Sequence, residues 1–154
     1  MHLMINHLPI VGTFLGTLVL IFALWRRSDH TEVAAYFLFI ISSLGAVIAY
    51  LTGEGAEEAV EHIQGISKNA IERHEDFSIY PLILLIILGI ASIAGIILIL
   101  KRSGWTKKMS YIILTFSVVS LGFITWAGYL GGQIRHTEMN KEPVSVQNRY
   151  RGKS

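Results

Sequence analysis

Apolar and polar positions are separated into long blocks along this chain. Four apolar runs, each about 20 residues long, alternate with polar segments. A helix that rises 1.5 Å per residue needs about 20 residues to cross the hydrocarbon core of a bilayer. We therefore predict membrane-spanning helices at residues 8–25, 33–51, 79–100 and 109–130.

The predicted fold is an all-α integral membrane four-helix bundle with up-down topology. Lipid offers the backbone no hydrogen-bond partner, so each run must satisfy its own N–H and C=O groups as a helix. No charged residue lies inside any of the four predicted spans. Residues 1–140 form the bundle in this interpretation, and residues 141–154 form a polar C-terminal tail.

Basic residues at the span ends predict the orientation. The two short connections hold Arg26, Arg27, Lys101, Arg102, Lys107 and Lys108, whereas residues 52–78 hold seven acidic residues against two basic ones. The positive-inside rule places the short connections in the cytoplasm and both termini in the periplasm of a bacterial inner membrane. The residues after the fourth span oppose this assignment, because they are also basic, at Arg135, Lys141, Arg149, Arg151 and Lys153.

Composition excludes several kinds of function. The chain has no cysteine, which excludes disulfides, thiolate metal sites and c-type haem attachment. It is 52% hydrophobic and only 16% charged, which is typical of a protein in contact with lipid. No basic stripe with interleaved aromatic residues is present, so nucleic acid is not an expected partner.

Most histidines fall on one side of the predicted membrane. Along an up-down path, five of the six histidines lie on the acidic side, and only His30 lies on the basic side. The five are His2, His7, His62, His74 and His136. This asymmetry is the strongest functional signal in the sequence.

Spacing places some carboxylates beside these histidines. Glu54, Glu58 and His62 are four residues apart and would share one face of a helix. The two glycines of TGEG argue against a regular helix at this point, so the stacking is expected only from Ala56 onward.

The helix that carries His74 has two alternative starts. It begins either at Ser78, with Pro81 in its first turn, or near Ser67, with Pro81 inside it. We favour the second, because IERHEDFSIY contains no turn signal. This start would carry His74 into the mouth of the bundle.

Imidazoles and carboxylates together bind metals or relay protons. We predict a transition-metal site, with iron favoured over zinc or manganese, at the periplasmic mouth. The expected ligands are His7, His74 and His136, with Glu54 and Glu58 as ligands or as supporting hydrogen-bond partners. His2 is a further candidate ligand. Asn6 is predicted to cap the first helix, which would put His7 in its first turn.

Other functions remain open. The main alternative is a b-type cytochrome, in which two of His7, His74 and His136 bind haem b. A metal-free or proton-coupled transporter and a non-catalytic subunit of a respiratory or transport complex are further alternatives. A redox role would imply an electron-transfer partner in the periplasm or the membrane.

Three motifs resemble an uncharacterised bacterial family of four-helix membrane proteins. HLMINHLPIVG is similar to the family pattern HPxxVHFPIA, TGE to its TG-acid ending of the second span, and GYLGGQIRH to GxLGGxxxxxH. The resemblance implies a polar signature at His2, His7, Glu54, His74 and His136. It also implies membrane electron transfer, since some members look fused to Rieske or cytochrome c modules. Leu3 replaces the usual proline, and HTEMN replaces HGVGV.

Small residues allow helices to approach closely in lipid. Gly12 and Gly16 form a GxxxG pair, and Gly128, Gly131 and Gly132 lie in GYLGG. Either group predicts helix packing within the chain or an interface between copies in a homo-oligomer.

Overall fold

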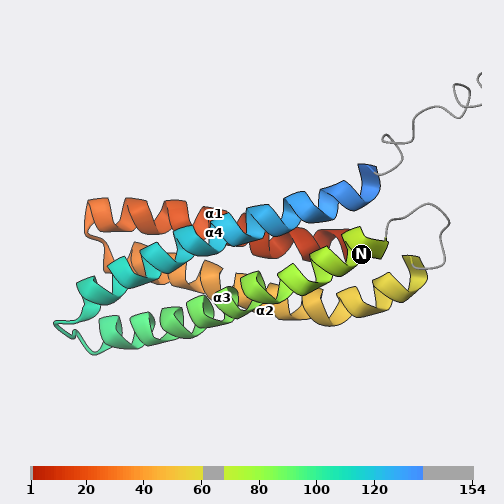
Figure 1. Cartoon of the computed structure of the whole chain (residues 1–154). Helices are drawn as coiled ribbons and strands as arrows, with labels where there is room; N and C mark the ends of the chain where they lie inside the picture. Colours follow the sequence, from red (N-terminus) through yellow and green to blue (C-terminus); the bar gives the residue numbers. More distant parts are fainter. Residues whose placement is uncertain (1, 61–67, 137–154) are drawn as a thin grey trace, which may run out of the picture.

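The computed structural model describes the backbone of residues 2–60 and 68–136, and the side chains of residues 7–52 and 77–129. Its helices are α1 (His2–Arg26), α2 (Asp29–Val60), α3 (Lys68–Leu100) and α4 (Thr106–His136) (Figure 1). The described ranges contain no strand. All four helices are long and apolar enough to cross a membrane, which confirms the predicted all-α class of integral membrane protein.

The four helices form a ring of antiparallel neighbours. Each helix packs against the next one in the chain, and α4 also packs back against α1. The start of α1, the end of α2, the start of α3 and the end of α4 therefore lie at one end of the bundle (Figure 1). This arrangement confirms the up-down topology.

Helix boundaries differ from the sequence predictions at two places. α2 continues through TGEG to Val60, so the predicted interruption is wrong. Glycine costs a helix about 1 kcal/mol, which backbone hydrogen bonds on either side outweigh. α1 begins at His2, so Asn6 is not its cap. α3 begins at Lys68 and contains Pro81, as the favoured alternative predicted.

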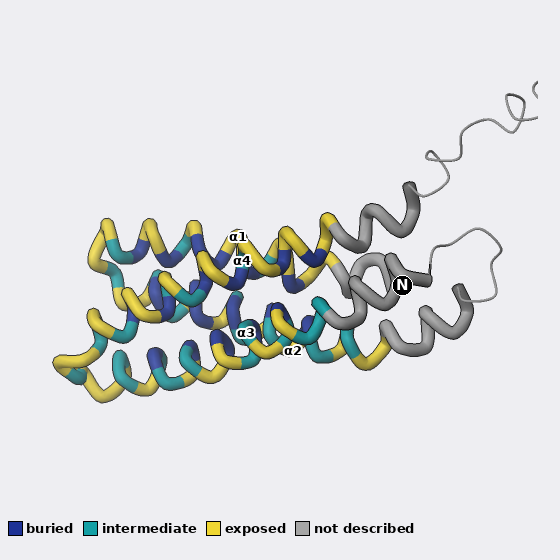
Figure 2. The backbone as a smooth tube through the Cα atoms, viewed as in Figure 1, coloured by how far each residue is buried: buried dark blue, intermediate teal, exposed yellow. Residues whose placement is uncertain are grey.

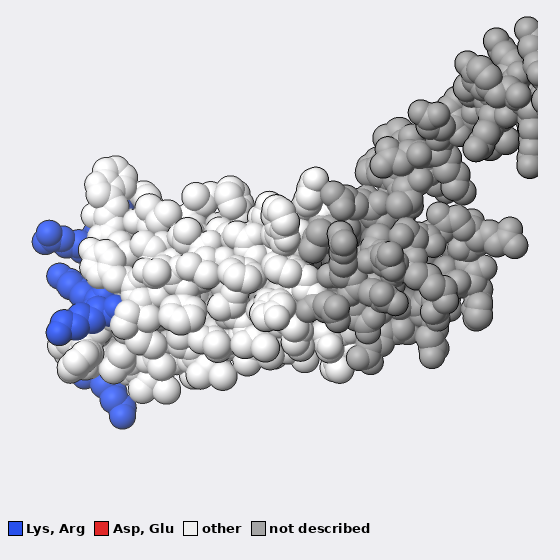
Figure 3. Space-filling view, in the orientation of Figure 1, with Lys and Arg blue, Asp and Glu red and all other residues white. Residues whose placement is uncertain are grey.

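Both short corners are built in the same way. Arg27 and Arg102 have positive φ angles of 53° and 50°. A residue in this left-handed conformation ends a helix by letting the next N–H reach back to a free carbonyl. The reaching bonds run from Ser28 N to Ala23 O (3.1 Å) and from Ser103 N to Leu98 O (3.0 Å). Repeated corners thus place basic residues at one end of the bundle (Figure 3).

Buried and exposed positions alternate along each helix (Figure 2). The exposed positions include many large apolar residues, and the buried ones include several small polar residues. Phe14, Leu44, Ile90 and Val118, one from each helix, are all at least half exposed. Among the described side chains, seven Ser and Thr residues are buried: Thr13, Thr17, Ser42, Ser92, Ser110, Ser117 and Ser120. This distribution suits a protein surrounded by lipid. Lipid is as apolar as the side chains, so moving them from lipid into the bundle gains little free energy.

Most buried hydroxyls donate to a carbonyl of their own helix. The Ser42 and Ser92 hydroxyls donate to Leu38 O and Leu88 O, each at 2.7 Å. Such bonds satisfy the hydroxyl without a partner from another helix. The Thr13 hydroxyl has no partner among the described residues.

Glycines bring α1 against α2. A Cβ added to Gly16 would lie 2.7 Å from Cε1 of the buried Phe39, and one added to Gly12 would meet the Ser42 hydroxyl. The GxxxG pair therefore packs within the chain, and this face is not open to a second copy. Gly122 and Gly128 on α4 have no atom within 4 Å of an added Cβ.

We predict that Gly16→Ala lowers the stability of the bundle by about 1–3 kcal/mol, because the new methyl group would force Phe39 out of its place. Gly122→Ala is the matched control, with open space around it, and is expected to cost nothing or to stabilise α4 slightly. Denaturant unfolding in detergent micelles measures both variants. Equal stability of the two would contradict the tight α1–α2 contact.

Candidate functional site

The bundle topology gathers the predicted ligands at one end. His2 and His74 lie at the starts of α1 and α3, and Glu54, Glu58 and His136 lie at the ends of α2 and α4 (Figure 1). The backbone thus brings these positions to a common end, opposite the basic corners. His62 lies outside the described residues, and only His7 of this group has a described side chain.

The helix register distinguishes two of the histidine positions. In a packed bundle, residues seven apart repeat the same face of a helix. Position 2 continues the series Pro9, Gly16 and Ala23, all three of which are buried. Position 74 continues the series Pro81, Leu88 and Gly95, also all buried. Positions 2 and 74 are therefore in register with the interior faces of α1 and α3.

The other two histidine positions are in register with outer faces. His7 is exposed, and so are Phe14 and Ile21, seven and fourteen residues further on. Position 136 continues the series Thr115, Gly122 and Tyr129, all exposed. His7 is therefore on an outer face of α1, although the sequence analysis named it an expected ligand and His2 only a further candidate.

The two glutamate positions also differ in register. Position 58 continues the exposed series Phe37, Leu44 and Leu51. Position 54 continues a partly buried series, Val33, Ile40 and Val47. Position 54 is therefore in register with a partly buried face of α2.

The described residues contain no group of three or more His, Asp or Glu side chains that would hold a metal ion. Five predicted ligands are not among the described side chains, namely His2, Glu54, Glu58, His74 and His136. Their donor atoms, imidazole nitrogen and carboxylate oxygen, suit divalent iron, manganese or zinc. The predicted metal site therefore stays a prediction.

A buried carboxylate lies at the opposite end of the bundle, where the sequence interpretation expected none. Glu32 in the first turn of α2 is only 4% exposed. Its Oε2 accepts a 2.6 Å hydrogen bond from the Ser110 hydroxyl of α4 and a 3.3 Å bond from the Tyr36 hydroxyl. The Tyr36 hydroxyl is also 2.9 Å from Ser110 Oγ. These three side chains, the Glu32 cluster, connect α2 to α4.

A glycine of α3 leaves room for the Tyr36 ring of the Glu32 cluster. A Cβ added to Gly95 would lie 2.8 Å from Cε2 of Tyr36 and 2.9 Å from Cδ1 of Ile113. The missing side chain at position 95 therefore lets the buried Tyr36 ring lie against the α3 backbone. Residues of three helices together exclude water from the carboxylate.

The sequence contained a signal for this cluster. Glu32, Ala35, Tyr36 and Phe39 follow helical spacing and are all buried on one face of α2. The predicted span began at Val33, whereas the apolar helix begins at Asp29, four residues earlier, and therefore includes Glu32.

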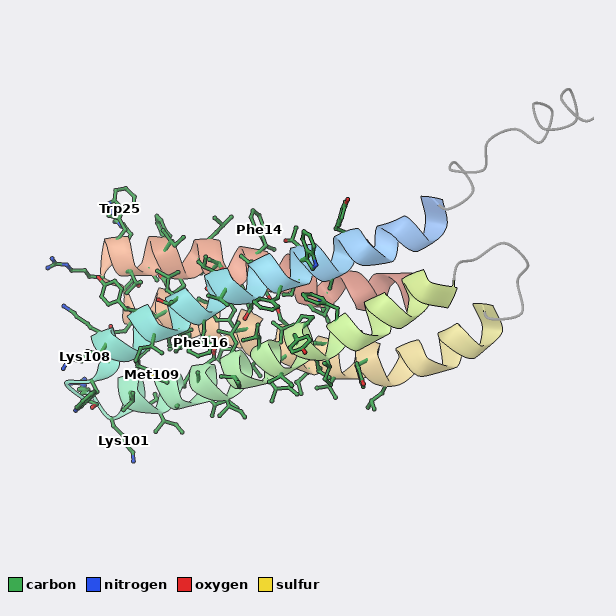
Figure 4. The ribbon with its side chains drawn as sticks, viewed as in Figure 1. Phe14, Trp25, Lys101, Lys108, Met109 and Phe116 are labelled. Atoms are coloured by element: carbon green, nitrogen blue, oxygen red, sulfur yellow. The ribbon has the colours of Figure 1, made fainter. Side chains whose placement is uncertain are left out.

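The basic residues at this end project outward from the bundle. All six basic corner residues are exposed, and Figure 3 shows basic side chains projecting from this end. Lys101 and Lys108 extend away from the helices (Figure 4), and the Lys108 ammonium lies 4.6 Å from the Trp105 ring centre. The described hydrogen-bond partners of the Glu32 carboxylate are the hydroxyls of Tyr36 and Ser110.

Comparison with known proteins provides no family. No protein-family model, no curated protein and no solved structure matches the chain. The resemblance to the four-helix membrane family therefore stays a prediction.

We predict that Ser110→Ala destabilises the protein by about 1–3 kcal/mol, because the buried Glu32 carboxylate loses its nearest donor. Ser117→Ala is the matched control on the same helix, since Ser117 is equally buried but bonds only Leu114 O of its own helix. Its expected cost is below about 1 kcal/mol. Thermal unfolding in detergent compares the two, and equal losses would mean that the Ser110–Glu32 bond contributes nothing.

Proposed function

We propose that this protein holds a transition-metal ion, with iron favoured over zinc or manganese, and uses it in electron transfer or redox chemistry. The proposed site is at the end of the bundle opposite the basic corners, here called the outer end. The two imidazoles that bind the ion are those of His2 and His74. The observation that carries the proposal is register, because positions 2 and 74 each continue a series whose described members are all buried.

Glu54 is the carboxylate that completes this proposed ligand set. Position 54 lies on α2, the helix that packs against both α1 and α3, and continues a partly buried series. Two imidazoles and one carboxylate are a ligand set of non-haem iron sites, and they leave coordination positions open. His7, Glu58 and His136 follow exposed series, so we assign them to the rim of the site rather than to the metal.

Haem b is the second candidate for the same position. α1 and α3 run in the same direction, are separated by α2 along the ring, and both begin at the outer end. Histidines on two such helices can bind the two axial positions of one haem iron, which needs no carboxylate. A haem between them would absorb strongly in the visible range, which a non-haem site would not.

We assign the basic end to the cytoplasm of a bacterial inner membrane. The outer end and both termini then face the periplasm, where an electron-transfer partner would approach. The six exposed basic residues at the corners support this orientation.

We predict that purified protein contains a stoichiometric metal, and that the double variant His2→Ala/His74→Ala loses it. Each lost imidazole removes a direct bond to the ion, so the loss is expected to exceed tenfold in metal content. Elemental analysis measures the metal, and the visible spectrum distinguishes haem from non-haem iron.

The double variant His7→Ala/His136→Ala is the matched control. It removes two histidines from the same end of the bundle but from positions in register with outer faces, and we expect it to retain the metal. Metal loss in this control and retention in His2→Ala/His74→Ala would contradict the assignment by register. Absence of both metal and haem from the native protein would contradict the proposed function itself.

The orientation is testable because the chain has no cysteine. We predict that Gly104→Cys, at an exposed corner, reacts with a membrane-impermeant maleimide only after the cells are permeabilised. Ser154→Cys is expected to react in intact cells. The reverse labelling pattern would place the basic corners in the periplasm.

A further inference from the structure

We propose that the basic end of the bundle is a binding surface for anionic phospholipids. The cations of the two corners bind the lipid phosphate, and the exposed apolar side chains beside them contact the upper part of the acyl chains. This inference depends neither on a metal at the outer end nor on which side of the membrane the basic end faces.

The first argument is an excess of exposed positive charge. Six basic residues are exposed at this end (Figure 3), namely Arg26, Arg27, Lys101, Arg102, Lys107 and Lys108. Among the described residues of the two corners, Asp29 is the exposed acid, because Glu32 is buried. The corners therefore carry far more exposed positive than negative charge, and anionic headgroups attract such cations at a membrane surface.

The second argument is that large apolar side chains lie directly beside these cations. Trp25 precedes residues 26–27 at the first corner, Leu100 precedes residues 101–102 at the second, and they are 77% and 75% exposed. Trp105 is 66% exposed, and the Lys108 ammonium lies 4.6 Å from its ring centre. Tryptophan rings of membrane proteins lie at the depth of the headgroups, which puts this ammonium at the depth of the phosphates. A lipid contacts both kinds of side chain at once, whereas a soluble acidic partner would use only the cations.

The third argument concerns where on this end the phosphate binds. α2 begins with the acids Asp29 and Glu32 in its first turn. α4 has no acid in its first turn and holds Lys107 and Lys108 there instead. The positive end of the helix dipole disfavours lysine, and an anion beside it relieves this repulsion. The corner between α3 and α4, from which Lys101 and Lys108 extend away from the helices (Figure 4), is therefore the preferred place for a phosphate.

Tryptophan fluorescence tests the proposal in vesicles of phosphatidylcholine and phosphatidylglycerol, with bromine on the acyl chains of one lipid at a time. Bromine quenches the fluorescence of tryptophans that the brominated lipid contacts. Trp126→Phe keeps Trp25 and Trp105 at the basic end. In this variant we expect phosphatidylglycerol to bind about fivefold more strongly than phosphatidylcholine, which is the effect of about one cation near an anionic surface. Trp25→Phe/Trp105→Phe is the matched control, since it keeps Trp126 in the outer half of α4 and should show no such preference.

Two charge-matched variants of Trp126→Phe show whether the corner cations cause the preference. Lys101→Gln/Lys107→Gln/Lys108→Gln removes three cations from the preferred corner and should abolish most of it. Lys141→Gln/Arg149→Gln/Arg151→Gln removes the same charge from the C-terminal tail and should leave it unchanged. Equal quenching by the two brominated lipids in Trp126→Phe would overturn the proposal and favour a soluble acidic partner instead. Equal losses in the two triple variants would overturn the assignment to the corners.

Discussion

The whole structure depends on one constraint, which is that polar groups inside the bundle must find their hydrogen-bond partners within the protein. Lipid offers none, so the backbone is helical throughout its apolar segments. The same requirement explains why buried serines such as Ser42 and Ser92 donate to carbonyls of their own helices. It also gives the Glu32 cluster its importance, since it is where a buried side chain carries an ionisable group and bonds across helices. A hydroxyl that bonds its own helix does not hold two helices together, whereas the bond between Ser110 and Glu32 connects α2 to α4.

Close packing in this bundle depends on glycines at the helix contacts as well as on a hydrophobic core cluster that includes Leu20, Phe39, Leu88 and Ile113. Gly12 and Gly16 bring α1 against α2, and Gly95 lets Tyr36 lie against α3. Large apolar side chains are mostly directed outward, as expected where the surroundings are as apolar as leucine itself. A consequence is that substitutions toward larger residues are costly inside the bundle and cheap at open positions such as Gly122.

The two ends of the bundle differ in chemistry. One end has two tight corners, where arginines in the left-handed conformation close the helices and exposed basic side chains surround them. At the other end, the helix ends and the segments that follow them carry most of the histidines and acids of the chain. The proposed metal site and the Glu32 cluster lie at opposite ends of the bundle, so residues of one can be substituted without touching those of the other.

The amino-acid sequence by itself determined the fold class, the number of spans, the up-down path and the gathering of histidine positions at one end. These follow from the length of the apolar runs and from the strict need for helices in lipid, which leave few alternatives. Only the tertiary structure showed which face of each helix packs inside the bundle. Register separates positions 2 and 74 from 7 and 136, and this depends on how neighbouring helices pack, because nearly every face of these helices is apolar. For the same reason Glu32, one residue outside its predicted span, was recognised as buried only once Ser110, far away in the sequence, was found beside it.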